Sequence, residues 1–212
     1  MTITHHPSDA TLAAYAAGNL DEARGLVVAT HVSLCGACRN AVRGFEAAGG
    51  ALLEAAEPAE LSTGALQRAM AALGPLDIIA PAAPGAATAS DLPAPLSHYA
   101  VGPWRWIGRG VQWRPVEVAS DAGVRVFMLK AAPGTKLPRH RHTGTEWTCV
   151  FEGAFTHALG RYGSGDFDEA DESVEHDPVV DSEHGCVCLV ALQGHIELQG
   201  WLGRLIQPFV RI

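Results

Sequence analysis

Three metal-binding side chains are closely spaced near the N-terminus, in the stretch HVSLCGAC. His31, Cys35 and Cys38 stand at positions i, i+4 and i+7, which fall on one face of a helix. Two thiolates and an imidazole suit tetrahedral Zn²⁺, and a closed structural site needs a fourth donor. His5 and His6 lie upstream, and either can supply it. The alternative is two buried thiols and a packed histidine, but an isolated Cys-x-x-Cys pair is far commoner than His-x-x-x-Cys-x-x-Cys.

A second group of donors lies in the stretch GTKLPRHRHTGTEWTCVFEG, residues 134–153. His140 and His142 are two residues apart, so they point the same way from a strand, and Glu146 follows a short turn. His176 is available farther along the chain. Imidazoles and a carboxylate on neighbouring strands make a mixed nitrogen and oxygen site for zinc, iron, manganese or nickel. The alternative is a row of exposed polar residues on a β-sandwich.

The first donor group lies in a part of the chain that reads as short helices. Ser8 or Asp9 can cap a helix over residues 10–18, which ends in glycine. Asp21 can cap a second helix over residues 22–34, whose apolar residues follow helical spacing. Histidine 31 falls on the inward-facing stripe of that second helix.

Two more helices are expected before the composition changes. A third runs from about residue 35 to 56 and is loosened at Gly49 and Gly50, and Ser62 caps a fourth over residues 63–73. Helices this short are marginal alone. A zinc ion that joins the start of the first helix to the turn between the second and third would add the missing stability.

The composition of the sequence changes twice after the predicted helices. Residues 75–95 are dense in Pro, Ala and Gly, which is typical of a linker. Beyond them, β-branched and aromatic runs such as VRVFMLKA, GCVCLVAL and LIQPFVRI alternate with Gly and Pro turns. Short strands without intervening helices predict an antiparallel sandwich or barrel. We therefore expect an all-α zinc-binding domain at 1–80, a linker at 81–95 and an all-β domain at 96–212.

Composition narrows the function classes. The chain has 212 residues, 48% of them hydrophobic, and a net charge of −8, so it can bury a core but offers no basic surface for nucleic acid. The first residues carry no basic leader and no run is long enough for a membrane span, which favours the cytoplasm. Five cysteines without a disulfide framework fit a reducing compartment.

Several residues outside the two donor groups have simple interpretations. Cys186 and Cys188 are two apart on a predicted strand and are read as small hydrophobic residues of a barrel wall. The alternative is that these thiols sense an oxidant. His157 has no partner spacing and is expected in a loop or on the surface, and the acidic run 166–183 is expected to be solvated.

The spacing of the second donor group resembles the first motif of the cupin family. That motif has Gly, five residues, His-x-His, three or four residues, Glu, six residues and Gly. Here the matching positions are Gly134, His140, His142, Glu146 and Gly153. The resemblance implies a double-stranded β-helix, or jelly-roll, barrel with a metal inside.

The second cupin motif is matched less completely. Counting from Gly165 places His176 at the position of the motif's histidine. Asp171 replaces the usual Pro, Ser173 the usual Gly and Val180 the usual Asn. The ligand is therefore retained, while the turn and the last polar group differ.

A helical unit with this zinc pattern, followed by a cupin, resembles the ChrR-type zinc-binding anti-sigma factors over essentially the whole chain. The resemblance implies that the N-terminal zinc ligands are His6, His31, Cys35 and Cys38. It implies that the ligands of a second divalent metal, expected to be zinc, are His140, His142, Glu146 and His176.

The resemblance also implies a function. Such a protein is not an enzyme: it sequesters an extracytoplasmic-function-type sigma factor in the cytoplasm, keeps it from RNA polymerase and releases it on oxidative stress such as singlet oxygen. We expect apolar residues of the helices, including Leu12, Tyr15, Leu26 and Phe45, to contact the sigma factor. The alternative is a metal-dependent cupin enzyme of the oxygenase kind, with the zinc unit as a docking module.

Overall fold

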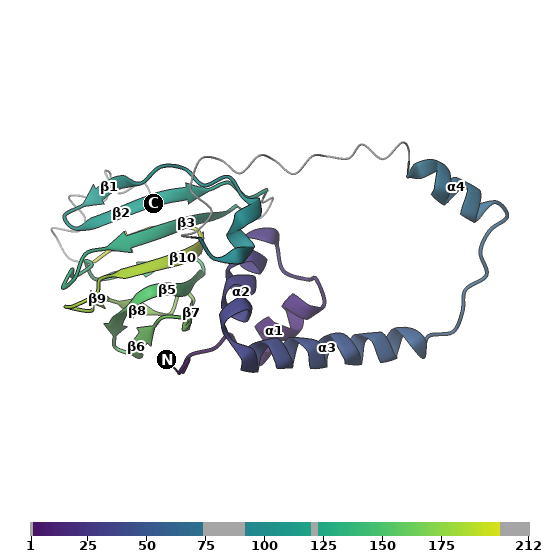
Figure 1. The fold of residues 1–212 in the computed structure, drawn as a ribbon, viewed down its shortest axis with the longest axis horizontal. Helices are drawn as coiled ribbons and strands as arrows, with labels where there is room; N and C mark the ends of the chain where they lie inside the picture. Colours follow the sequence, from purple (N-terminus) through teal and green to yellow (C-terminus); the bar gives the residue numbers. More distant parts are fainter. Residues whose placement is uncertain (1, 74–91, 120–122, 200–212) are drawn as a thin grey trace.

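In the computed structural model, residues 2–73, 92–119 and 123–199 are described, and within them helices precede a barrel of strands (Figure 1). The helices are α1 Asp9–Ala16, α2 Glu22–Leu34, α3 Gly36–Glu54, α4 Ala65–Ala72 and the 3-10 helix η1 Ala94–His98. The strands are β1 Arg105–Gly108, β2 Val111–Val116, β3 Val124–Ala131, β4 His140–His142, β5 Glu146–His157, β6 Gly160–Gly163, β7 Phe167–Ala170, β8 Glu175–His176, β9 Val179–Val180, β10 Cys186–Gln193 and β11 Ile196–Leu198. This order confirms the predicted fold class.

Some predictions fall on other parts of the chain. Most of the expected linker, residues 81–91, and the expected strand at 205–212 lie outside the described residues. The domain limits at residues 80 and 96 therefore stay predictions. No helix of the described ranges is long and apolar enough to cross a membrane.

The helix starts follow local capping chemistry. The Ser8 side chain accepts a hydrogen bond from the Thr11 backbone N–H, and that of Asp21 accepts one from the Arg24 N–H. These bonds satisfy amides that a helix leaves open at its first turn, so α1 and α2 begin where the sequence predicted.

The last two helices differ from expectation. Helix α3 runs unbroken through Gly49 and Gly50. Helix α4 begins after Gly64, which has a φ of 75° and gives no side-chain cap, rather than after Ser62. The left-handed turn at Gly64 stands between Ser62 and the first residue of α4, and the Ser62 hydroxyl instead accepts a hydrogen bond from the Arg68 guanidinium.

The barrel is built around strand β5. The main sheet has the order β1-β2-β3-β10-β5-β6, and β7 and β9 also pair with β5. Strand β7 pairs with the first half of β5, and β9 with the second half. A separate sheet has the order β11-β4-β8, in which His140 is paired directly with His176. This pairing brings together two of the predicted ligands from distant parts of the chain.

Helix α2 packs directly on the barrel. Val27 and Val28 of α2 are fully buried in one apolar cluster with Cys149 of β5 and Leu189 of β10. Figure 1 shows α2 lying against the strands, whereas the far end of α3 and all of α4 project away from them. The helices and the barrel thus share one core.

The shared core corrects one expectation about the surface. Leu12 and Leu26 are buried within it, and Tyr15 and Phe45 pack against it. Because Leu12 and Leu26 contribute to the core of the chain itself, they are not free to contact a partner protein.

Polar contacts reinforce the same interface. The Arg24 guanidinium donates hydrogen bonds to Thr145 Oγ1 at 2.8 Å and Gln193 Oε1 at 2.6 Å. It also lies over the Trp147 ring, 5.5 Å from the centroid. The helical part and the barrel are therefore joined by direct contacts in addition to the chain that connects them.

Replacing Leu189 by alanine should be strongly destabilising. Leu189 is 0% exposed at the centre of the shared core, and removing such a side chain leaves a cavity that costs about 2–5 kcal/mol. The matched control is Leu52→Ala, because Leu52 is 75% exposed and its loss should change stability by only about 0.5 kcal/mol. Urea denaturation compares the two, and equal midpoints would contradict this packing.

Candidate metal centres

The four residues predicted to form the first centre converge on one point. The Nδ1 atom of His6 lies 3.5 Å from Cys35 Sγ and 3.3 Å from Cys38 Sγ. The Nε2 atom of His31 lies 3.2 Å from Cys38 Sγ. Ligand atoms around a tetrahedral zinc ion are about 3.5 Å apart, so the observed separations fit such an ion.

The positions of these donors follow from the helix junction. His31 lies in the last turn of α2, and Cys35 is both the C-cap of α2 and the N-cap of α3. Cys38 follows in the first turn of α3, with its N–H directed at the Cys35 sulfur. The close spacing in sequence therefore places three donors at one corner. His6 reaches this corner from residues 2–8, the segment before α1, here called the N-terminal arm.

The adjacent histidine faces elsewhere. The His5 ring stacks on Tyr162 of the barrel, with 4.1 Å between centroids. Of the two histidines that the sequence left open, the structure brings His6 into the cluster and not His5.

Hydrogen bonding fixes the orientation of the His31 ring. Its Nδ1 atom lies 2.7 Å from the carbonyl oxygen of Gly165, which can only accept, so Nδ1 carries the proton and Nε2 presents a lone pair to the cluster. Burial lowers the pKa of His31 to about 4, which keeps the ring neutral. Burial also raises the pKa of Cys38 to about 12, so its ionisation requires a cation nearby.

Three of the four residues predicted for the second centre, His140, His142 and His176, converge inside the barrel, and the fourth, Glu146, contacts His142. His140 Nε2 lies 3.0 Å from His176 Nε2, and His142 Nε2 lies 3.0 Å from Glu146 Oε2. The Nδ1 atom of His140 donates to the carbonyl of Pro138 at 2.7 Å, which leaves Nε2 as the donor atom toward His176. Among the described residues, the buried Nδ1 atom of His176 has no hydrogen-bond partner. These features fit a divalent cation bound by three imidazoles and a carboxylate.

The electrostatics of the second centre favour a cation. Burial lowers the pKa of His176 to about 4 and also lowers that of His140. Burial opposes ionisation of Glu146, but the hydrogen bond with His142 and the nearby imidazoles hold its pKa at about 2. Burial also acts on His142, but the hydrogen bond with Glu146 and the charge of that carboxylate outweigh it and raise the His142 pKa. The centre thus offers a metal an ionised carboxylate and, in His140 and His176, two imidazoles that burial keeps neutral.

Two residues of this region were missed from the sequence. His157 is 7% exposed, and its Nε2 lies 3.2 Å from Asp168 Oδ2. Its ring contacts that of His176, with 5.1 Å between centroids. The expectation of a surface His157 and a solvated Asp168 is therefore wrong. A signal existed, because His157 stands two residues after Phe155 on one strand and so shares its buried face.

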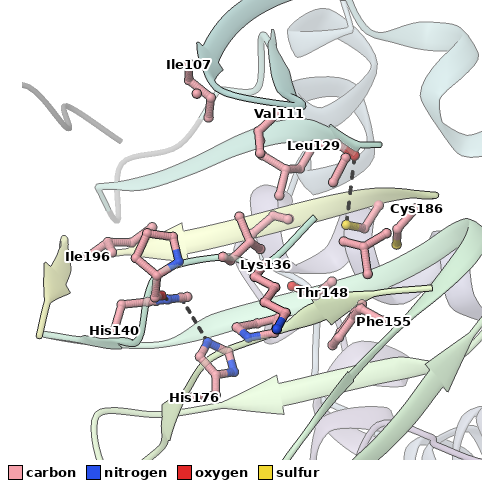
Figure 2. A pocket seen from close by; sticks show the side chains of 18 of the residues that line it. Ile107, Val111, Leu129, Lys136, His140, Thr148, Phe155, His176, Cys186 and Ile196 are labelled. Atoms are coloured by element: carbon pink, nitrogen blue, oxygen red, sulfur yellow. Dashed lines mark hydrogen bonds between the residues drawn. The ribbon is translucent and has the colours of Figure 1, made fainter. Parts of the chain in front are cut away.

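A cavity of about 390 Å³ opens beside the second centre (Figure 2). His140 and His176 lie at one side, and Lys136 extends toward them. Much of the wall is apolar and includes Ile107, Val111, Phe127, Leu129, Val190 and Ile196. The volume is in the range of pockets that hold small molecules.

Cys186 and Cys188 line this cavity as buried residues of the barrel wall. The hydrogen bond with Cys186 and burial raise the pKa of the Cys188 thiol well above its usual value. This environment favours the thiol over the reactive thiolate.

A helical corner of two thiols and two imidazoles, followed by a cupin-like barrel with a cluster of three imidazoles, defines a protein with two candidate metal centres. Residues 95–196 match the ChrR cupin-like domain family. The whole chain is 42% identical over 218 aligned positions to the anti-sigma-E factor ChrR of Cereibacter sphaeroides, covering 100% of both proteins. The chain therefore belongs to the ChrR family of anti-sigma factors.

A comparison with solved structures finds the same family over most of the chain. The chain is similar to the anti-sigma ChrR in the crystal structure of Rhodobacter sphaeroides SigE in complex with ChrR. The TM-score is 0.72 and the identity 38%, covering 91% of this chain and 100% of the other.

Zinc affinity at the first centre should rise with pH. Metal binding must expel the proton of a Cys38 thiol whose pKa burial raises to about 12, whereas His31, with a pKa of about 4, is already neutral. Between about pH 6 and 8, each thiol proton released should contribute about a tenfold gain per pH unit. Chelator competition at several pH values measures the slope, and Cys38→Ser should flatten it. A pH-independent affinity would contradict the thiolate assignment.

Proposed function

We propose that this protein is an anti-sigma factor that binds an extracytoplasmic-function-type sigma factor through its helical part and keeps it from RNA polymerase. The observation that carries the proposal is the full-length relationship to a ChrR protein that forms a complex with SigE. The chain then acts in the cytoplasm as a regulator by protein binding and not as an enzyme. Its net charge of −8 is also unsuited to direct contact with nucleic acid.

The docking surface that we propose comprises the C-terminal end of α3 and helix α4. Their large apolar side chains include Leu52, Leu53, Leu66, Met70 and Leu73, all of which are strongly exposed. An eight-residue helix is marginal on its own, so α4 needs a partner to cover its apolar side. We propose that the partner is the sigma factor. This surface replaces the one expected from Leu12 and Leu26.

We further propose zinc as the metal of the first centre. The donors are two sulfur and two nitrogen atoms with no additional position for a substrate, which is typical of structural zinc. Zinc here would hold α2, α3 and the N-terminal arm together, and α3 leads directly into the docking surface. For the second centre we propose a divalent metal, again zinc, bound by His140, His142, Glu146 and His176.

In this proposal the barrel responds to oxidative stress such as singlet oxygen, and this response lowers the affinity of the protein for the sigma factor. Its metal centre borders a cavity large enough to admit a small molecule, and Cys186 and Cys188 line that cavity. The same donors could hold iron for oxygenase chemistry, which is the competing interpretation. Membership of an anti-sigma family favours regulation.

Affinity capture with the full chain from the native cytoplasm tests sigma-factor binding. The wild-type chain should retain a sigma factor and lose it when a strong chelator removes zinc. Leu66→Glu combined with Met70→Glu should reduce retention by at least about tenfold, because two charges would be buried in an apolar contact. Leu159→Glu is the matched control, since Leu159 is 62% exposed on the barrel. Failure of the wild type to capture any sigma factor would refute the proposal.

The release step has its own test. His140→Ala combined with His142→Ala should still bind the sigma factor but should not release it when singlet oxygen is generated, because the second centre cannot hold its metal. Release is followed by size-exclusion chromatography of the complex. Release as fast as in the wild type would exclude a role for this centre. An unchanged response in Cys186→Ser/Cys188→Ser would exclude the thiols as sensors.

A further inference from the structure

Residues 163–169, here called the bridge segment, lie between the two candidate metal centres. The segment is the turn from β6 into β7 together with most of β7. Along it, side chains and carbonyl groups contact the N-terminal arm and α2 on one side and the imidazoles of the barrel on the other.

The bridge segment holds the arm on both sides of His6. Asp166 Oδ1 accepts hydrogen bonds from the backbone N–H groups of Thr4 at 2.7 Å and His5 at 2.9 Å. Glu169 accepts one from the Ser8 N–H at 3.0 Å. Since these contacts come just before and just after His6, they restrict where its imidazole can lie.

The bridge segment also holds His31 directly. The Gly165 carbonyl accepts the Nδ1 proton of His31, and the Phe167 ring meets the same imidazole edge-on, with 5.7 Å between centroids. Gly165 has a φ of 89°, and a Cβ atom there would lie 2.6 Å from Ile3 of the arm. Only glycine suits this position, because it allows both the conformation and the close approach of the arm.

The opposite side of the bridge segment meets the second centre. Asp168 lines the cavity and bonds His157, whose ring lies against His176. Asp168 therefore stands between Phe167 and Glu169, which both contact the helical part, and itself faces the barrel ligands. A displacement of His176 can therefore be transmitted through strand β7 to the residues that position the first centre.

We propose that the bridge segment couples the two metal centres: Gly165, Asp166 and Glu169 are positioning residues for His31 and His6, and Asp168 links them to His176. Two of the four zinc donors are thus held by the barrel. Occupancy of the barrel centre then changes zinc affinity at the helical centre, and by linkage the reverse is also true. This inference rests on the proposed metal sites but does not depend on sigma-factor binding.

Cobalt binding to the full-length protein tests the positioning role. Co²⁺ bound by thiolates has a charge-transfer absorption that reports the cysteine-containing centre alone, and chelator competition gives its dissociation constant. Asp166→Ala should weaken Co²⁺ binding at least about tenfold, as is usual for residues that orient metal ligands. Asp166→Asn keeps one oxygen acceptor and should recover part of the loss.

The controls separate this role from general destabilisation. Asp171→Ala removes a carboxylate that bonds only locally, to Ser173, and should leave Co²⁺ affinity unchanged. Glu169→Ala removes an exposed anchor and should weaken binding about threefold. If the thiolate band appears but Asp166→Ala and Glu169→Ala bind like the wild type, the inference is wrong. If no band appears even in the wild type, the proposed zinc site itself fails.

The coupling has a second measurement. His140→Ala/His142→Ala, which cannot load the barrel centre, should bind Co²⁺ at the thiolate centre at least about fivefold more weakly than the wild type, which is the lower end of the usual range of coupling energies. Adding Asp168→Ala to both proteins should abolish that difference, since the side chain that contacts His157 Nε2 is then lost. Equal affinities in the wild type and the double variant would overturn the coupling.

Discussion

The packing of helix α2 on the barrel fixes where the two candidate metal centres lie relative to each other. Val27 and Val28 bury that helix in the same core as Leu189 of β10, and Arg24 fixes it with hydrogen bonds to Thr145 and Gln193. The last turn of α2 then brings His31 to the Gly165 carbonyl. A residue of the proposed zinc centre is thereby part of the interface between the helices and the barrel.

The two centres differ in ways that suit different tasks. The first gathers two cysteines and two histidines at a junction of helices, where a bound ion would stabilise the local fold. The second places three imidazoles and an ionised carboxylate beside a cavity of a size that holds small molecules. In the proposed function, a structural centre at the start of α3, whose far end carries the proposed docking surface, and a second centre beside a cavity would together form the physical basis for a regulated anti-sigma factor.

Much of this could be predicted from the sequence, because the donors of each centre are set by short spacings. His31, Cys35 and Cys38 lie on one helix junction, and His140, His142 and Glu146 match a local motif. The choice of His6 over His5 could not be made locally. It depends on Asp166 and Tyr162, which are more than a hundred residues away in the chain.

Other features depended on contacts that no local pattern encodes. Asp168 belongs to an acidic run whose composition favours solvent, yet strand pairing turns it into the barrel beside His157. Leu12 and Leu26 have the apolar character of an interface, but both are buried in the core that the helices share with the barrel. Ser62 is a good N-cap by type, but the left-handed turn at Gly64 makes α4 begin two residues later. In the first two cases a tertiary contact outweighed the local preference.

The most direct test of the central claim is run-off transcription by RNA polymerase with the sigma factor recovered from the native complex. Adding the full-length protein in equal amount to that sigma factor should suppress transcripts from its promoter, and removing zinc should restore them. A polymerase that transcribes equally well with and without the zinc-loaded protein would contradict the assignment of anti-sigma function.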